Sequence, residues 1–271
     1  QKFFGVNPAS NPVTEVEIPP RPPVLCAGCP HRPVFYILKK HRVPVMGDIG
    51  CYGLGLQPPL EAVDTTVCMG ASVGMTHGFQ KASAWNGVPR KVVGVIGDST
   101  FFHGGMTGVA DMVFNNGSGV IVVLDNRTTA MTGHQPHPGT GITGKGEVTD
   151  EIKIEDVVRA LGVRDVQIVD SYDLQAVDQA VRHALDFDGP SVVICRRACA
   201  LLKGLPDLGK AVINQEQCTR CHACLRTGCP ALVSHPDKSV TIDTNACNGC
   251  FVCGQVCPVG AIEKVGGGER G

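Results

Sequence analysis

The larger part of this chain takes its fold from one stretch, Val92-Val-Gly-Val-Ile-Gly-Asp-Ser99. It is a short apolar run, rich in β-branched residues, that stops at a turn, as expected of a strand covered on both faces. Similar runs alternate with helical patterns along residues 24–200. This alternation predicts βαβ units and therefore an α/β fold with a doubly wound parallel sheet.

Five strands and five helices are expected in residues 24–200. The strands are predicted at Val43–Met46, Val92–Ile96, Val120–Leu124, Val166–Val169 and Ser191–Cys195. The helices are predicted at Pro33–His41, Ala71–Trp85, Gly104–Asn115, Ile154–Leu161 and Leu174–Phe187. The rest divides into an extended arm at 1–23, a linker at 201–212, a small α+β domain at 213–265 and a disordered tail at 266–271.

The small domain contains eight cysteines in two matched runs. These are Cys218-x2-Cys221-x2-Cys224-x4-Cys229-Pro230 and Cys247-x2-Cys250-x2-Cys253-x3-Cys257-Pro258. This is the spacing of a bacterial two-cluster ferredoxin, in which three thiolates of each run hold one 4Fe–4S cluster and the fourth crosses to the other. One cluster is therefore predicted on Cys218, Cys221, Cys224 and Cys257, and the second on Cys229, Cys247, Cys250 and Cys253.

Composition argues against several other classes. The 271 residues have a net charge of −1, so no basic surface predicts nucleic acid or an anionic membrane as a partner. No apolar run has the length of a membrane span, and Gln1–Ser10 carries no signal peptide. Disulfides suit small secreted domains and zinc usually takes paired Cys motifs, so eight of the 14 cysteines, those of the small domain, favour iron–sulfur clusters in a cytoplasmic protein. The missing initiator Met predicts a longer parent chain.

A second chemical signal follows two of the predicted strands. Gly97-Asp98-Ser99 ends one, and Leu124-Asp125-Asn126 ends the next. Ligands of open α/β sheets bind at the carboxyl ends of the strands, so Asp98 and Asn126 are expected at that edge. Their oxygens suit Mg²⁺, and Ser99 and Thr100 can donate hydrogen bonds to a diphosphate. The alternative is that Gly97-Asp98 is only a turn.

A third set of cysteines lies outside the small domain. Cys26-Ala-Gly-Cys29 is a CxxC motif, Cys51 follows a predicted strand, and Cys199 follows the last strand. Four thiolates at strand ends could converge beside the diphosphate site. The residues alone leave this open against a thioredoxin-like CxxC with buried free cysteines.

The strand-end pattern resembles the thiamine diphosphate motif, Gly-Asp-Gly with a later Asn, although Ser99 stands where that motif usually has Gly. The resemblance implies that Mg²⁺ is bound by Asp98, Asn126 and the carbonyl of Thr128. It also implies that Ala130 and Met131 lie near the cofactor.

Residues 24–200 as a whole resemble the thiamine-binding domain of the 2-oxoacid:ferredoxin oxidoreductases. That resemblance implies a proximal 4Fe–4S cluster on Cys26, Cys29, Cys51 and Cys199, rather than on Cys195, which should face the core. Cys68 has no cluster assigned. Further cofactor-binding residues implied by the resemblance are Ile49, Gly50, Cys51, Tyr52, Cys68, Met69, Gly70 and Gly97.

Residues 21–265 resemble more narrowly the C-terminal half of the alpha subunits of indolepyruvate ferredoxin oxidoreductases. The matching stretches are Cys26-Ala-Gly-Cys-Pro-His-Arg32, Gly47-Asp-Ile-Gly-Cys-Tyr52, Gly97-Asp-Ser-Thr-Phe-Phe-His103 and Leu124-Asp-Asn-Arg-Thr-Thr-Ala-Met-Thr-Gly-His-Gln-Pro-His-Pro-Gly139. Such subunits are about twice as long, and their first half supplies the pyrimidine-binding domain and the Glu that activates thiamine. The resemblance therefore implies a partner chain or domain.

The implied reaction is oxidative decarboxylation of indolepyruvate or another aryl-2-oxoacid with coenzyme A, as found in anaerobes. Implied partners are the chain with the pyrimidine-binding domain, a gamma/beta-type oxidoreductase subunit and external ferredoxin, in a hetero-oligomer. Thiamine and the clusters carry the difficult chemistry, while the protein places them. Two alternatives stay open, namely a ferredoxin fused to a degenerate thiamine-type domain, and a family member acting on a different 2-oxoacid.

The histidines are the candidates for proton transfer. His31, His103, His134 and His137 lie in or beside the matching stretches. Any of them could act as a general acid–base or bind the substrate carboxylate. For each of them a structural, hydrogen-bonded role in a Gly/Pro-rich loop is the favoured alternative.

Overall fold

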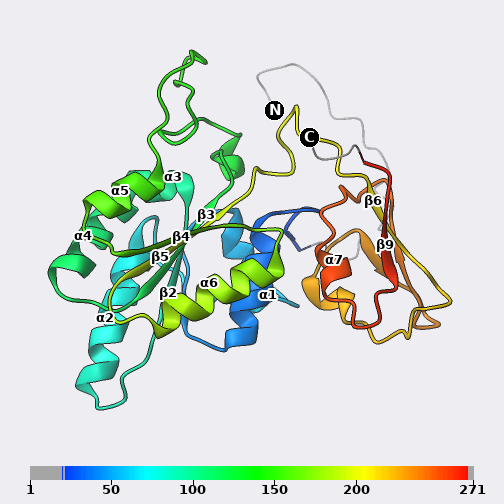
Figure 1. Ribbon diagram of the computed structural model, residues 1–271, viewed down its shortest axis with the longest axis horizontal. Helices are drawn as coiled ribbons and strands as arrows, with labels where there is room; N and C mark the ends of the chain where they lie inside the picture. The colour runs from blue at the N-terminus through cyan, green and yellow to red at the C-terminus, as the bar shows by residue number, and fades with distance from the viewer. Residues whose placement is uncertain (1–19, 21, 268–271) are drawn as a thin grey trace, which may run out of the picture.

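The computed structural model describes residue 20 and residues 22–267, and Figure 1 shows them as two units side by side. The larger unit precedes residue 200 and the smaller one follows it. The predicted arm lies almost entirely outside the described residues, as do residues 268–271 of the predicted tail. In the described part of the chain, no helix has the length and apolar character needed to cross a membrane.

A five-stranded sheet with the order β1-β2-β3-β5-β4 forms the centre of the larger unit, and every pair in it is parallel. The strands are β1 Val45–Met46, β2 Val93–Gly97, β3 Val120–Asp125, β4 Asp165–Asp170 and β5 Ser191–Arg196. All five predicted strands are present, and the α/β prediction is confirmed. The first is two residues shorter than predicted, because Pro44 has no N–H for the ladder.

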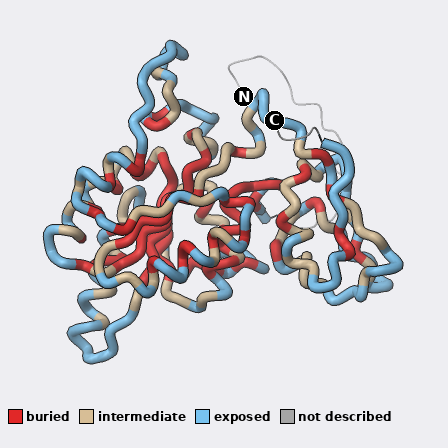
Figure 2. Tube along the Cα trace, in the orientation of Figure 1, coloured by how far each residue is buried: buried red, intermediate tan, exposed pale blue. Residues whose placement is uncertain are grey.

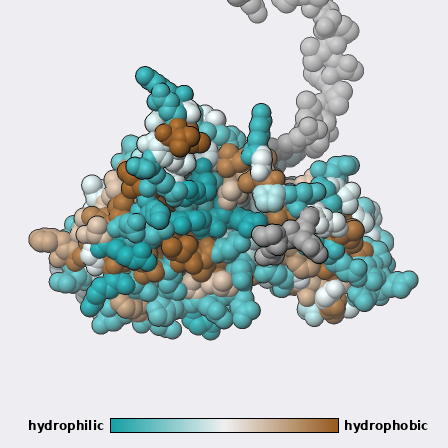
Figure 3. All heavy atoms as spheres, turned by 45° about the horizontal axis from the view of Figure 1, so that its top comes forward, coloured by the Kyte–Doolittle hydropathy of each residue, from teal (hydrophilic) through white to brown (hydrophobic). Residues whose placement is uncertain are grey.

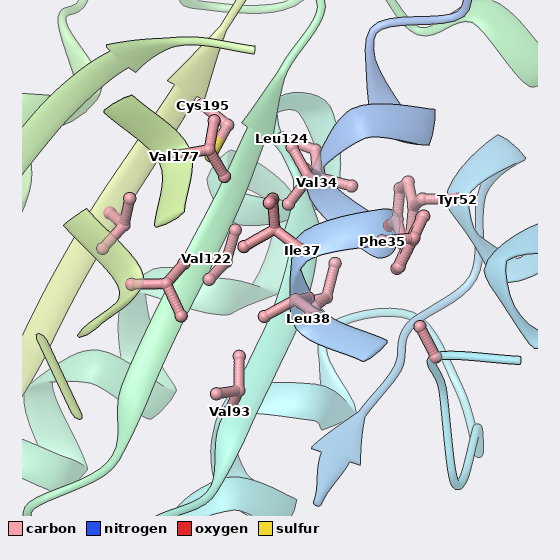
Figure 4. Packing of buried hydrophobic residues seen from close by; sticks show 14 of the residues in the cluster. Val34, Phe35, Ile37, Leu38, Tyr52, Val93, Val122, Leu124, Val177 and Cys195 are labelled. Atoms are coloured by element: carbon pink, nitrogen blue, oxygen red, sulfur yellow. The ribbon is translucent and has the colours of Figure 1, made fainter. Parts of the chain in front are cut away.

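Helices cover both faces of this sheet, which explains why the strands are almost continuously apolar. The helices are α1 His31–His41, α2 Ala71–Trp85, α3 Asp98–Thr100, α4 Met106–Phe114, α5 Ile154–Ala160 and α6 Leu174–Asp186. Alternate residues of β3 enter two separate cores, with Val122 on the side of α1 and α6 and Val123 on the side of α4 and α5. Figure 2 shows the resulting layer of buried strands, and Figure 4 shows Ile37 and Leu38 of α1 beside Val122.

The helix after β2 differs from the prediction. A helix was expected from Gly104, but α3 begins directly at Asp98 and continues through a π-helical turn, Phe101–Gly105, into α4. Such turns are rare and often occur at functional sites. Here the turn places Phe101 fully in the core while His103 stays exposed.

The smaller unit consists of two antiparallel pairs of short strands with two helical turns. Its elements are β6 Lys210–Ile213, η4 Cys224–Thr227, β7 Leu232–Ser234, β8 Val240–Ile242, α7 Val252–Gln255 and β9 Ile262–Val265. Strand β6 pairs with β9, and β7 pairs with β8. Because β6 starts at Lys210, the ordered unit takes in the last three residues of the predicted linker.

Backbone-directed hydrogen bonds join the two units. Gln255 of α7 donates to the Tyr172 carbonyl at 2.6 Å and accepts from the Leu174 N–H at 3.0 Å. Within the larger unit, the Tyr172 hydroxyl donates to the Gly28 carbonyl at 2.5 Å. Gly28 lies between two cysteines of the CxxC motif with φ of +67°, where a Cβ would stand 1.9 Å from Asn248 Nδ2. The close approach of the units therefore requires glycine at this position.

We expect Gly28→Ala to loosen the smaller unit, because Ala is strained by about 1–2 kcal/mol at this φ and also displaces Asn248. Limited proteolysis should then cut the exposed stretch 201–207 faster. Gly78→Ala is the matched control, since a Cβ there meets nothing within 4 Å. Equal cleavage of the two variants would contradict the prediction.

Candidate functional site

The carboxyl ends of β2 and β3 meet at one edge of the sheet, as the sequence predicted. Gly97 pairs with Leu124 in the ladder, so Asp98 and Asn126 follow on neighbouring strands. A pocket of about 560 Å³ opens there. Its walls are His31, Ile49, Gly50, Cys51, Tyr52, Met69, Gly97, Asp98, Ser99, Thr100, Leu124, Asn126, Thr128, Thr129, Ala130, Met131 and Thr132.

Most of the residues predicted to bind the cofactor line this pocket. Cys68 and Gly70 do not, although Met69 between them does, and the Gly70 N–H is directed to Asp48. Leu124, Thr129 and Thr132 line it without having been predicted. The pocket wall thus combines five segments of the chain: the starts of α1 and α3, the turn after β1, the residue Met69 before α2 and the loop after β3.

Three oxygen-bearing groups converge at the bottom of the pocket. Asp98, Asn126 and Thr128 are all buried. One end of the Asn126 carboxamide lies 2.7 Å from the Thr128 carbonyl and 3.3 Å from Asp98 Oδ2. With the amide oxygen at that end, three acceptors face one another, an arrangement that a cation would stabilise; with the nitrogen there, it donates to both oxygens.

His137 supports Asp98 from behind. Its Nε2 lies 3.0 Å from Asp98 Oδ2, and both side chains are almost fully buried. The Gly139 N–H donates to Nδ1 at 3.2 Å, so in the neutral ring the proton belongs on Nε2, facing the carboxylate. The sequence showed that His137 lies beside the matching motif, but it did not predict the contact between His137 and Asp98.

His31 is the one candidate histidine that lines the pocket. Burial lowers its pKa to about 4, although the charge of Asp98 opposes this shift. The ring is therefore neutral at physiological pH, with Nε2 3.5 Å from Asn126 Nδ2. His103 and His134 are exposed instead, and His134 Nε2 lies 3.9 Å from Cys199 Sγ.

Asp48 is an important residue that the sequence reasoning missed. Its fully buried carboxylate accepts hydrogen bonds from the backbone N–H groups of Ile49, Gly70 and Ser72. The bond from Ser72 caps the start of α2. Asp48 therefore ties the Cys51 turn to the Met69 segment, two walls of one pocket. Its position in Gly47-Asp-Ile-Gly, after a strand, was the available signal.

The four cysteines assigned to the proximal cluster are close enough for their charges to affect one another's pKa. Burial raises the pKa of Cys51, and the charges of Cys199 and Cys26 raise it further. Burial also raises the pKa of Cys29 to about 12, with smaller contributions from Cys26 and Cys199. The Cys199 N–H donates to the Asn126 carbonyl at 2.9 Å, which connects this group to the pocket. Cys195 faces the core, as expected.

The eight C-terminal cysteines gather in the two predicted groups of four. One pocket, of about 450 Å³, is lined by Cys229, Cys247, Cys250 and Cys253, together with Cys29. Another, of about 340 Å³, is lined by Cys218, Cys221, Cys224 and Cys257. Among the described residues, no three His, Cys, Asp or Glu side chains are close enough to hold a single metal ion.

A parallel sheet with a pocket and a buried carboxylate and amide at its carboxyl edge defines an α/β domain of the kind that binds its ligand at the strand ends. Residues 48–195 match the thiamine pyrophosphate enzymes through their C-terminal TPP binding domain, and the chain belongs to that family. It therefore carries a thiamine diphosphate-binding domain, as predicted.

Curated relatives extend the match to almost the whole chain. Indolepyruvate oxidoreductase subunit IorA of Archaeoglobus fulgidus is 45% identical over 97% of this chain, and that of Pyrococcus horikoshii is 45% identical over 99%. These matches cover 44% and 46% of the relatives, so the chain spans about half their length. They confirm the resemblance to the indolepyruvate oxidoreductase subunit.

Among solved structures, 2-oxoglutarate:ferredoxin oxidoreductase from Magnetococcus marinus is similar, with a TM-score of 0.57 and 17% identity. The likeness covers 70% of this chain and 68% of that one. It supports the fold of the larger unit.

Protonation of His31 should lower stability in mild acid. Its folded pKa of about 4 lies below the unfolded value of about 6.5, so below pH 6.5 the unfolded state binds the extra proton. Between pH 7.5 and 5.5 we expect the protein to lose about 1 kcal/mol more stability than His31→Gln does. Denaturant unfolding at both pH values measures this difference, and parallel losses would contradict it.

Proposed function

We propose that this chain is the thiamine diphosphate-binding, electron-relaying part of a 2-oxoacid:ferredoxin oxidoreductase. Its substrate would be indolepyruvate or another arylpyruvate, converted with coenzyme A to the acyl-CoA, CO₂ and reduced ferredoxin. One observation carries the proposal: the pocket that holds Asp98 and Asn126 also includes Cys51, and Cys199 is bonded to the Asn126 backbone. The cofactor site and the first electron acceptor would thus lie next to each other in the same pocket wall.

The pocket fits Mg²⁺ and a diphosphate. Asp98, Asn126 and the Thr128 carbonyl supply hard oxygen donors, the ligands that Mg²⁺ prefers. The Thr129 hydroxyl donates to the Ser99 hydroxyl at 2.9 Å, and because both residues line the pocket, their hydroxyls could donate to phosphate oxygens. Thiamine diphosphate, when bound, would supply the carbanion chemistry and the electron sink.

The chain's own residues would orient this cofactor and hold the Asp98 carboxylate in position. His137 holds the Asp98 carboxylate toward the metal position. His31 offers a neutral imidazole at the pocket wall, and we assign it a positioning role. Tyr52 donates to the Ile49 carbonyl at 2.9 Å, which fixes the turn that carries Cys51.

Electrons would leave through three 4Fe–4S clusters in the order of their sites. The first would be held by Cys26, Cys29, Cys51 and Cys199. Cys29 also lines the pocket of the second, on Cys229, Cys247, Cys250 and Cys253. The third, on Cys218, Cys221, Cys224 and Cys257, would pass electrons to external ferredoxin.

The mouth of the pocket has exposed apolar side chains that a partner domain could cover. Ile49, Met69 and Met131 line it yet are exposed, as expected of side chains that another domain covers. Elsewhere, Figure 3 shows apolar side chains in separate patches on the visible face. We assign the cover to a chain or domain with the pyrimidine-binding site and the activating Glu, in a cytoplasmic hetero-oligomer with a gamma/beta-type subunit.

Anoxic purification with metal and cofactor analysis tests the proposal. We expect about twelve Fe per chain and bound thiamine diphosphate once the partner is present. About eight Fe without thiamine would instead favour the ferredoxin fused to a degenerate domain. Turnover of indolepyruvate against phenylpyruvate, pyruvate and 2-oxoglutarate would then identify the substrate.

Asp98→Ala should abolish retention of thiamine diphosphate while leaving the C-terminal clusters intact, because it removes the buried carboxylate at the metal position. Cofactor content after gel filtration and iron content measure the two effects. Asp150→Ala, at an exposed carboxylate away from the pocket, is the control. Retention of thiamine by Asp98→Ala would show that the metal assignment is wrong.

A further inference from the structure

Arg32 lies buried where the two units meet. It is in the first turn of α1 and only 4% exposed. It lines the same pocket as Cys29 of the larger unit and Cys229 and Cys250 of the smaller one. The side chain is therefore positioned between two of the proposed cluster sites.

The guanidinium is held by carbonyl groups of both units. One terminal nitrogen, Nη1, donates to the Thr227 carbonyl at 3.0 Å and to that of Gly228. The other, Nη2, donates to the Cys26 carbonyl at 3.1 Å and to that of Leu25. These bonds fix the group across the interface while leaving Nε buried without a hydrogen-bond partner.

No carboxylate balances this charge. Within residues 22–267, none of the ion pairs includes Arg32. Burial lowers the pKa of Arg32, and the thiolate charges that oppose this shift are those of Cys229, Cys29, Cys250 and Cys26. A buried cation is costly unless it is compensated, and the cysteines that line the pocket with this one belong to both groups.

We propose that Arg32 is a shared counter-charge for the first and second clusters and raises the reduction potentials of both. The inference rests on the proposed function, which places clusters on these cysteines. Net charge and hydrogen bonds to sulfur are known determinants of cluster potential. A fixed positive charge stabilises the added electron on either cluster.

The third cluster site provides an internal reference. Its pocket contains Arg220, whose side chain is 54% exposed. Water and salt screen a charge of that kind far more than a buried one. The structure therefore assigns a buried counter-charge to two of the three sites.

The test compares Arg32→Gln, which removes the charge, with Arg32→Lys, which keeps it. Both are loaded anaerobically in the complete complex, and iron content is measured first. Redox titration followed by electron paramagnetic resonance then gives three midpoint potentials, with the third cluster identified by its loss in Cys221→Ala. Arg220→Gln is the matched control.

We expect Arg32→Gln to lower the potentials of the first two clusters, so that the reduced-to-oxidised ratio at a fixed potential falls at least tenfold. For one electron this corresponds to about 59 mV. The third cluster should be unchanged, Arg32→Lys should retain most of the wild-type potentials, and Arg220→Gln should move none of the three.

Several outcomes would overturn the inference: unchanged potentials, an equal shift of all three clusters, or the same shift in Arg32→Lys as in Arg32→Gln. If Arg32→Gln fails to assemble the two clusters while Arg32→Lys assembles them, the need for charge is supported; failure of both overturns it. Wild-type protein with only about eight Fe would overturn the proposed function and this inference together. Full iron with unmoved potentials would overturn the inference alone.

Discussion

The parallel pairing of β3 with its neighbours is the constraint on which the site depends. One partner, β2, places Asp98 beside the end of β3, and the other, β5, runs in register as far as Arg196. Backbone bonding continues past the strands, with the Cys199 N–H bonded to the Asn126 carbonyl. The same ladder thus links the positions of Asp98, Asn126 and Cys199 through the backbone.

Buried charge behind the ladder makes this edge rigid. The Asp125 carboxylate accepts from Arg196 at 2.6 Å, and Arg196 also forms a two-pronged bond with Glu155. Burial and the charge of Asp98 raise the pKa of Asp125, while Arg196 opposes the shift. Removing that arginine would leave two buried carboxylates close together, which is strongly unfavourable. The network keeps the loop after β3 in place, next to the residues that line the pocket.

The sequence was sufficient for the sheet because each strand is apolar on both faces and ends at a turn. It was also sufficient for the two cysteine groups, whose spacing alone sorted them into the sets that now line separate pockets. The π-helical turn at Phe101–Gly105 was missed because its local pattern is that of an ordinary helix. The role of Asp48 was missed for another reason. Its partners are backbone N–H groups, two of them about twenty residues away, and every residue other than proline has such a group, so the residue types give no signal for these bonds.

The turn between Cys26 and Cys29 belongs to both units at once. Gly28 accepts the Tyr172 hydroxyl and leaves room for Asn248, while Arg32 reaches from the following helix to Thr227. The two units are therefore poor candidates for independent exchange. A chimera that takes its C-terminal unit from a distant homologue would have to bring a small side chain opposite Gly28 and a carbonyl within reach of Arg32. The practical boundary of a transplantable C-terminal unit in this chain thus runs through the first CxxC motif, well before the linker that joins the two units in sequence.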